Sequence, residues 1–459
     1  MGRLIGSEGL ILQLQLPRKS YDLETPCRNS NLRIRSIDTF TLEERRTVIL
    51  TVRRHVFASL VCLLLYGVLI WLVPIKLIAQ VIPEPPGSTE PTRLTAPRIQ
   101  PLPEEHWTDA HKALVARYGP EVRVGNAFKT LLNVPELLEA VMPFMLYITT
   151  SDSTLSPRHR ELLILRTAWL CQNVYVWADH VPVARIAGVT TEEVRRIAQG
   201  PAANGWDPFE STLLSLADEL FRNSAVRDTT WSALEARYDL YHMVDAVMTV
   251  NEFTLLSMLF NSIGIQPDDS ARARFPTGIP YRLTVPDREP PLTAPRVDPI
   301  EGPGIRVRRT FARHPRVAET RRGNSNYVNR ISPLTPHYRE LLILRIGWNC
   351  QAVYEWAKHV GSVGRARDHG LEPEWIAAGP DAPGWNAFEM AHLHAADEIY
   401  RDGIVSDTTW NALAERYNTR EMMSVVMTVA NYRLVSMSLN AFGVQPLDTD
   451  ELFPVIPLH

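Results

Sequence analysis

Two glutamate–histidine pairs stand out because they share one spacing and similar surroundings. The interval from Glu161 to His180 is the same as the interval from Glu340 to His359. In both copies the glutamate opens the phrase Glu-Leu-Leu-Ile-Leu-Arg. A carboxylate that accepts a hydrogen bond from imidazole fixes the ring tautomer and raises its basicity, which suits proton transfer near neutral pH. We therefore predict these four residues as catalytic and expect each pair to lie within hydrogen-bonding distance.

The second copy carries one more carboxylate than the first. Glu355 precedes His359 by four residues, so both side chains share one face of a helix, whereas the first copy has Val176 at this position. We predict Glu355 as a further catalytic residue and the second site as the more complete. The alternative is that both pairs are hydrogen-bonded, inert groups at a domain interface.

Aromatic and thiol side chains follow each glutamate at matched positions. The aromatic residues could wall an apolar pocket, which predicts a substrate-binding role, although core packing is the commoner use of tryptophan; they are Tyr175, Trp177, Tyr354 and Trp356. Cys171 and Cys350 are candidate thiol nucleophiles. No second cysteine lies nearby to resolve a sulfenic acid, so buried packing is the favoured interpretation.

Two other repeated residue types are expected to have structural roles. Arg166 and Arg345 could hold a substrate carboxylate, but an ion pair with the glutamate of the same helix is favoured. In the repeated phrase Asp-Thr-Thr-Trp, we expect Asp228 and Asp407 to cap the following helix through a side-chain oxygen.

Composition and charge exclude several classes of protein. The chain has 459 residues, 45% hydrophobic and 22% charged, which predicts two or three domains with a sizeable core. A net charge of −3 without a basic stripe argues against a nucleic-acid partner. Four scattered cysteines provide neither a disulfide framework nor structural-zinc spacing, so no metal site is predicted.

The N-terminal part of the chain predicts a membrane anchor. Residues 1–55 are polar, with four arginines near their end, and residues 56–82 form an apolar stretch long enough to span a bilayer. The arginines favour a cytoplasmic location for the N-terminal side. The alternative is a soluble, cytoplasmic protein in which this stretch is a buried helix or an extension. Residues 83–103 are a proline-rich linker.

The remainder predicts an all-α fold of two tandem domains, residues 104–283 and 284–459. Apolar residues recur at helical spacing, and strand alternation with turn signals is absent. Thr95-Ala-Pro-Arg98 returns as Thr293-Ala-Pro-Arg296, so each copy opens a repeat too long for a solenoid unit. The second repeat is expected to break its helical pattern at residues 321–326, Arg-Arg-Gly-Asn-Ser-Asn.

The string Arg-Glu-Leu-Leu-Ile-Leu-Arg…Cys…Tyr-Glu-Trp-Ala-x-His resembles the carboxymuconolactone decarboxylase family, which includes the AhpD-like alkylhydroperoxidases. The later Ser-Met-x-x-Asn-x-x-Gly-x-Gln stretches are similar to the same family, so the likeness covers about residues 94–268 and 292–447. It implies all-helical AhpD-like domains that assemble into trimers or hexamers, here a trimer of tandem chains.

The resemblance implies a cofactor-independent lyase that acts on a small carboxylated or lactone-type substrate. In the decarboxylase branch the substrate carbonyl accepts the electrons, and a positioned histidine supplies the proton. The peroxidase branch uses a CxxC pair, and both cysteines are missing here: their positions hold Asn173 and Val176 in one repeat and Ala352 and Glu355 in the other. A peroxidase that uses Cys171 or Cys350 is one alternative, and a non-catalytic oligomeric scaffold is another.

Overall fold

The computed structural model describes residues 85–120 and 122–454, and every regular element within these ranges is a helix. The all-α prediction is therefore confirmed. The first half contains η2 (Glu104–His106), α2 (Asp109–Tyr118), α3 (Asn126–Leu131), α4 (Pro135–Thr149), α5 (Pro157–Leu170), α6 (Val174–Ile186), α7 (Thr191–Gln199), α8 (Pro208–Asn223), α9 (Asp228–Glu235), α10 (Leu240–Ile263) and α11 (Asp269–Arg272).

The second half contains α12 (Arg306–Phe311), α13 (Pro315–Thr320), α14 (Arg322–Asn326), the π-helix η3 (Tyr327–Ile331), α15 (Pro336–Asn349), α16 (Val353–Val360), η4 (Ala366–His369), α17 (Pro373–Ala378), α18 (Ala387–Asp402), α19 (Asp407–Ala414) and α20 (Thr419–Phe442). The predicted polar segment 1–55 and membrane anchor 56–82 lie outside the described residues.

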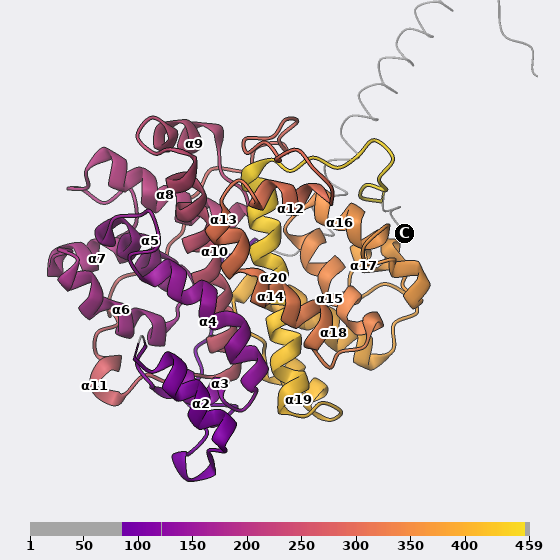
Figure 1. Cartoon of the computed structure of the whole chain (residues 1–459), viewed down its shortest axis with the longest axis horizontal. Coiled ribbons are helices and arrows are strands. Elements are labelled where there is room, and N and C mark those ends of the chain that lie inside the picture. Colours follow the sequence, from indigo (N-terminus) through magenta and orange to yellow (C-terminus); the bar gives the residue numbers. More distant parts are fainter. Residues whose placement is uncertain (1–84, 121, 455–459) are drawn as a thin grey trace, which may run out of the picture. The chain divides into compact units, whose positions relative to one another are not determined.

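Two long helices, α10 and α20, lie side by side at the centre, with the helices of each half of the chain around them (Figure 1). The side chain of Asn251 donates to Ser438 Oγ across this junction at 2.9 Å. Both helices are buried on nearly all sides, as expected of core helices. Of the described helices, α10 is long and apolar enough to cross a membrane, but here it is buried within the protein.

The repeated Thr-Ala-Pro-Arg phrases pack against the ends of the two central helices. Helix α10 ends at Gly264 and α20 at Gly443, both in the left-handed conformation that favours glycine. A Cβ on Gly264 would lie 2.9 Å from the carbonyl oxygen of Ala96, and one on Gly443 would lie 2.7 Å from that of Ala294. Glycine is thus required at both positions by backbone conformation and by close packing.

The arginines of these phrases connect each half of the chain to the other. Arg98 pairs with Asp407 at 2.6 Å, and Arg296 pairs with Asp228. The prediction that these aspartates are side-chain caps is wrong, because each is the first residue inside its helix. The cap of α19 is Ser406, whose hydroxyl accepts from the Thr409 amide.

The predicted interruption at residues 321–326 is also wrong. Residues 322–326 form α14 and continue directly into η3, so the segment stays helical despite its glycine and asparagines. Gly323 packs against the backbone of Ala140 on α4, which gives it a close-contact role in place of a helix-breaking one. Both halves lie in one compact unit, and the boundary between residues 283 and 284 stays a prediction.

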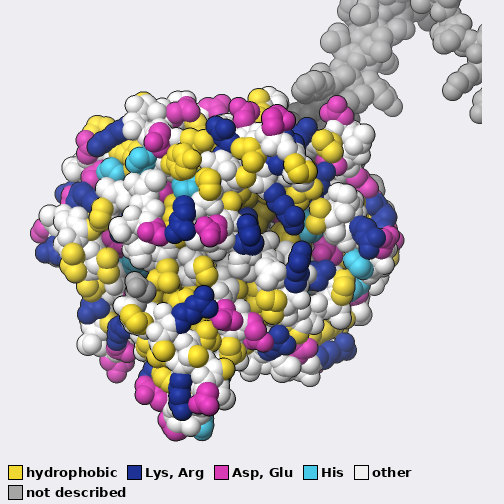
Figure 2. Space-filling model, viewed as in Figure 1, with side chains coloured by type: hydrophobic (Ala, Val, Ile, Leu, Met, Phe, Trp, Pro, Cys, Tyr) yellow, Lys and Arg dark blue, Asp and Glu magenta, His cyan; other side chains and the backbone are white. Residues whose placement is uncertain are grey.

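The face of the molecule in Figure 2 shows acidic, basic and hydrophobic side chains interspersed, and no large patch of one charge covers it. Elsewhere in the described residues, exposed side chains of opposite charge form ion pairs, such as Arg316 with Asp152 at 2.6 Å and Arg367 with Glu451 at 2.8 Å. This face therefore offers mixed charge rather than a surface of one sign.

Candidate functional site

Each predicted glutamate–histidine pair is joined by a hydrogen bond between two adjacent helices. His180 Nδ1 on α6 lies 2.9 Å from Glu161 Oε2 on α5, and His359 Nδ1 on α16 lies 2.6 Å from Glu340 Oε2 on α15. Both glutamates are buried. A carboxylate that accepts the Nδ1 proton leaves Nε2 of the ring as the atom able to accept or deliver a proton.

The outer nitrogen of each ring has no hydrogen-bond partner among the described residues. Nε2 of His359 is accessible from the surface, and so is Nε2 of His180. The His359 side chain is 7% exposed and that of His180 is 16% exposed, so the second pair is the more enclosed.

The carboxyl groups of Glu340 and Glu355 have pKa values displaced in opposite directions. Burial alone would raise the pKa of Glu340, but the charge and hydrogen bond of His359, assisted by Arg339, outweigh burial and lower it. Burial raises the pKa of Glu355 well above its usual value. The hydrogen bond from the Ser436 hydroxyl lowers this pKa, whereas the nearby charge of Glu340 raises it further. The pKa values of the two carboxyls are thus displaced away from each other, a pattern typical of acid–base sites.

Glu355 is accommodated by a neighbouring glycine. A Cβ on Gly347 would lie 3.1 Å from Glu355 Oε1, and the first repeat has Ala168 and Val176 at the two matching positions. Ser436 Oγ donates to Glu355 Oε2 at 2.5 Å, whereas Oε1 is buried without a partner among the described residues. The extra carboxyl of the second repeat is therefore accompanied by the loss of a methyl group on the adjacent helix.

Two residues near the second pair were not predicted from the sequence. The ring of Tyr432 on α20 lies edge-on to His359, with ring centres 5.0 Å apart, and its hydroxyl donates to Asn329 Oδ1 at 3.0 Å. In the first repeat, Phe253 occupies the same place beside His180. Gly364 packs so closely on the Glu340 carboxylate that a Cβ would collide with it. The sequence contained one indication of Tyr432, because this tyrosine stands at the position of Phe253 in the first repeat.

The prediction that Arg166 and Arg345 pair with the glutamates of their own helices is wrong. Arg166 pairs with Asp218 at 2.6 and 2.8 Å, and Arg345 pairs in the same way with Asp397. Each guanidinium also donates to two backbone carbonyls. Side chains five residues apart on a helix point roughly 140° away from each other, so each arginine cannot reach the glutamate of its own helix. Both arginines are structural ion-pair residues.

Comparison with known proteins identifies the family of one segment. Residues 135–219, which contain Glu161 and His180, match the model of the Carboxymuconolactone decarboxylase family. This part of the chain is similar to that family. A crystal structure titled "uncharacterized peroxidase-related protein from Silicibacter sp. TM1040" is similar at 17% identity and a TM-score of 0.33, covering 41% of this chain and 97% of that chain. No curated protein matches.

The decarboxylase-family segment and its counterpart each bury their cysteine completely. Cys171 and Cys350 are 0% exposed, and burial raises the pKa of the thiols to about 12 and about 11. A thiol needs an accessible, acidified environment to act as a nucleophile. These surroundings are those of packing residues.

The predicted substrate-binding aromatic residues occupy two kinds of environment. Trp177 and Trp356 are fully buried, each beside a second tryptophan with ring centres 6.0 and 5.5 Å apart. Tyr175 packs edge-on against Phe260, and the Tyr354 hydroxyl accepts a hydrogen bond from the Val307 amide. Their contact with a substrate stays a prediction, as does assembly of the chain into a trimer.

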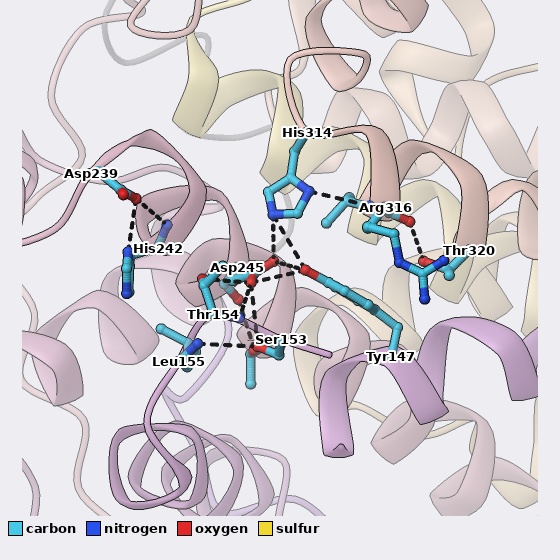
Figure 3. A network of polar contacts seen from close by, with 12 residues as sticks. Tyr147, Ser153, Thr154, Leu155, Asp239, His242, Asp245, His314, Arg316 and Thr320 are labelled. Carbon is cyan, nitrogen blue, oxygen red and sulfur yellow. Dashed lines mark hydrogen bonds and ion pairs between the residues drawn. The ribbon is translucent and has the colours of Figure 1, made fainter. Parts of the chain in front are cut away.

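A further acid–imidazole cluster joins the first half of the chain to the second (Figure 3). Asp245 on α10 accepts from the hydroxyl of Tyr147 at 2.8 Å and from the amide and hydroxyl of Thr154 at 2.8 and 2.7 Å. His314 Nε2 lies 3.3 Å from the same carboxylate, while its Nδ1 accepts from the Val317 amide and caps α13. Both ring nitrogens are occupied, so this cluster has a structural role.

Proposed function

We propose that the chain catalyses cofactor-independent proton transfer of the lyase type on a small carboxylated or lactone-type substrate, with the second repeat as the principal site. The observation that carries this proposal is the presence of an imidazole-bound carboxylate, Glu340, near a buried carboxyl, Glu355, whose pKa is raised by burial. General acid–base catalysis uses such paired groups of divergent acidity.

Each residue has a separate role in this proposal. Glu340 holds His359 with Nε2 directed away from the carboxylate, so that Nε2 exchanges the proton with the substrate. Glu355, whose pKa is raised by burial, serves as the protonated acid near Glu340. The family match of residues 135–219 supports a reaction of this class, and the matched geometry extends it to the second repeat.

The test is turnover of carboxymuconolactone and related unsaturated carboxylates by the full chain, followed as release of carbon dioxide. His359→Asn should lower kcat by about 10²-fold or more, since a positioned acid–base group contributes about that factor. Glu355→Val, which installs the first repeat's side chain, should lower kcat similarly. Cys350→Ser should leave turnover unchanged.

The matched control is His180→Asn, which removes the imidazole of the first repeat. A smaller loss in this variant than in His359→Asn is expected if the second site is the principal one. Undiminished turnover in His359→Asn would contradict the assignment. Loss of turnover in Cys350→Ser, together with consumption of peroxide by the unmodified chain, would favour thiol chemistry instead.

A further inference from the structure

A cavity of about 420 Å³ lies where the segment between the two repeats crosses the second repeat. Its wall comes from the loop between α8 and α9, from residues 288–293, from the start of α16 and from the end of α20. The apolar part of the lining includes Val226, Val353, Leu439 and Val444. A cavity of this size accommodates a small organic ligand.

One cation in this wall, Arg288, is held by backbone carbonyls alone. Its Nη1 donates to the carbonyl oxygens of Asn223 at 3.1 Å and Cys350 at 2.7 Å, and its Nη2 donates to that of Gln351 at 3.2 Å. These bonds fix the guanidinium at the cavity but leave its positive charge without a counter-charge among the described residues. Burial accordingly lowers the pKa of Arg288, and no carboxylate is among the groups that oppose this.

The nearest acidic side chains are already engaged elsewhere. Glu289 accepts from Arg227 Nε at 3.2 Å and from the Asp228 amide at 2.9 Å. Asp228 itself pairs with Arg296. Nε of Arg288 has no hydrogen-bond acceptor among the described residues, and this atom is accessible from the cavity side or the surface. The edge formed by Nε and Nη2, which matches a carboxylate in width, is therefore available to a ligand.

The first repeat contains an equivalent cavity without such a cation. It has a volume of about 320 Å³ and is lined in part by counterparts of the same residues, with Phe260 at the position of Leu439. Its two arginines are exposed and engaged: Arg93 with Glu90 and Arg272 with Gln266. The two cavities thus differ in that Arg288 has backbone partners alone, whereas the arginines of the first repeat's cavity are bonded to side-chain oxygens.

We propose that the cavity at Arg288 is a binding site for a small organic carboxylate, with the carboxylate on the free edge of the guanidinium and the apolar body against Val226, Val353 and Leu439. Neither Glu340 nor His359 lines this cavity, so the site goes beyond the proposed proton-transfer function. Its ligand need not be the substrate of that reaction.

The test is calorimetric titration of the full chain with benzoate, with benzamide as the neutral ligand of nearly the same shape. Benzoate should bind, and benzamide should bind at least tenfold more weakly. Arg288→Gln should weaken benzoate at least tenfold, because a charge-assisted pair is lost. Arg93→Gln, the control in the sister cavity, should leave benzoate affinity unchanged, and so should His359→Asn.

A second variant covers the case in which Arg288→Gln fails to fold. Leu439→Phe installs the first repeat's side chain and narrows the cavity, so it should weaken benzoate while Arg288 remains. The proposal is overturned if benzoate does not bind at millimolar concentration, if benzamide binds equally well, or if folded Arg288→Gln or Leu439→Phe binds benzoate as tightly as the unmodified chain. Because His359→Asn tests the catalytic site separately, the two proposals can fail independently.

Discussion

Replacement of Glu252 by glutamine should stabilise the protein, increasingly so as pH rises. Glu252 lies on α10 and is 0% exposed. Its one hydrogen-bond partner among the described residues is Asn324, at 3.3 Å, and its Oε1 has none. Burial raises the pKa of this carboxyl from 4.5 to about 8, although Asn324 and the charge of Arg321 oppose the change.

The sign of the effect follows from proton binding. Between pH 4.5 and about 8 the folded chain keeps a proton on Glu252 that the unfolded chain has released. The free energy of unfolding then falls by about 1.4 kcal/mol per pH unit from this group, or about 3 kcal/mol between pH 4.5 and 7. Glutamine resembles the protonated acid in shape and has no such dependence, so the variant should match the unmodified chain near pH 4.5 and exceed it at pH 7.

The assay is urea unfolding followed by circular dichroism at a series of pH values between 5 and 7.5. The second repeat supplies the matched control, since Asn431 stands at the position of Glu252 on α20. Asn431→Asp should introduce the opposite trend and lose stability as pH rises. A stability difference between Glu252→Gln and the unmodified chain that stays constant across this range would refute the assigned protonation state.

Two further changes probe the structural ion pairs and the buried thiols. Asp397→Asn should destabilise the fold by about 3–5 kcal/mol in urea unfolding, because it leaves the buried guanidinium of Arg345 without a counter-charge. The control, Glu451→Gln at an exposed ion pair, should cost less than about 1 kcal/mol. Equal losses of stability in the two variants would contradict this prediction. Iodoacetamide should label Cys171 and Cys350 only after denaturation, as mapped by peptide mass spectrometry, and rapid labelling of either in the native chain would show it to be accessible.

Local sequence predicted the main helices well, because their boundaries depend on neighbouring residues. Ser156 and Pro157 begin α5 through a side-chain cap and a proline at the first position, and glycine ends α10. Asp207 and Pro208 begin α8 in the same way. The interruption expected at residues 321–326 failed because packing on α4 outweighed the weak helix preference of Gly323 and its neighbours.

Contacts between distant parts of the chain could not be predicted in the same way. An aspartate just before Thr-Thr-Trp has the local features of a helix cap, and only the fold reveals that Asp407 instead meets Arg98, 309 residues away. Repetition was the signal available, since both members of the pair belong to repeated phrases. The partners of Arg166 and Arg345 likewise come from α8 and α18, which no spacing within one helix could indicate.

The candidate site was predictable where repetition marked it and not where it depends on packing. The shared spacing placed Glu161 with His180 and Glu340 with His359 across adjacent helices. Tyr432 and Ser436 reach the second pair only because α20 packs against α15 and α16. The central helices are buried on nearly every side, so no periodic pattern in their sequence reveals which neighbour a given residue faces.

The differences between the two repeats are coupled, and this coupling explains why the second site is the more polar. Glu355 stands where the first repeat has a valine and needs space, which Gly347 provides in place of Ala168. Its donor Ser436 is common to both repeats, since the first has Ser257 at that position. Tyr432 replaces a phenylalanine beside the imidazole and adds a hydroxyl that donates to Asn329. A buried carboxyl without such adjustments costs several kcal/mol, so a chance substitution at position 355 alone would be destabilising. The buried acid and the residues that accommodate it suit the proton-transfer role that we propose for the second site.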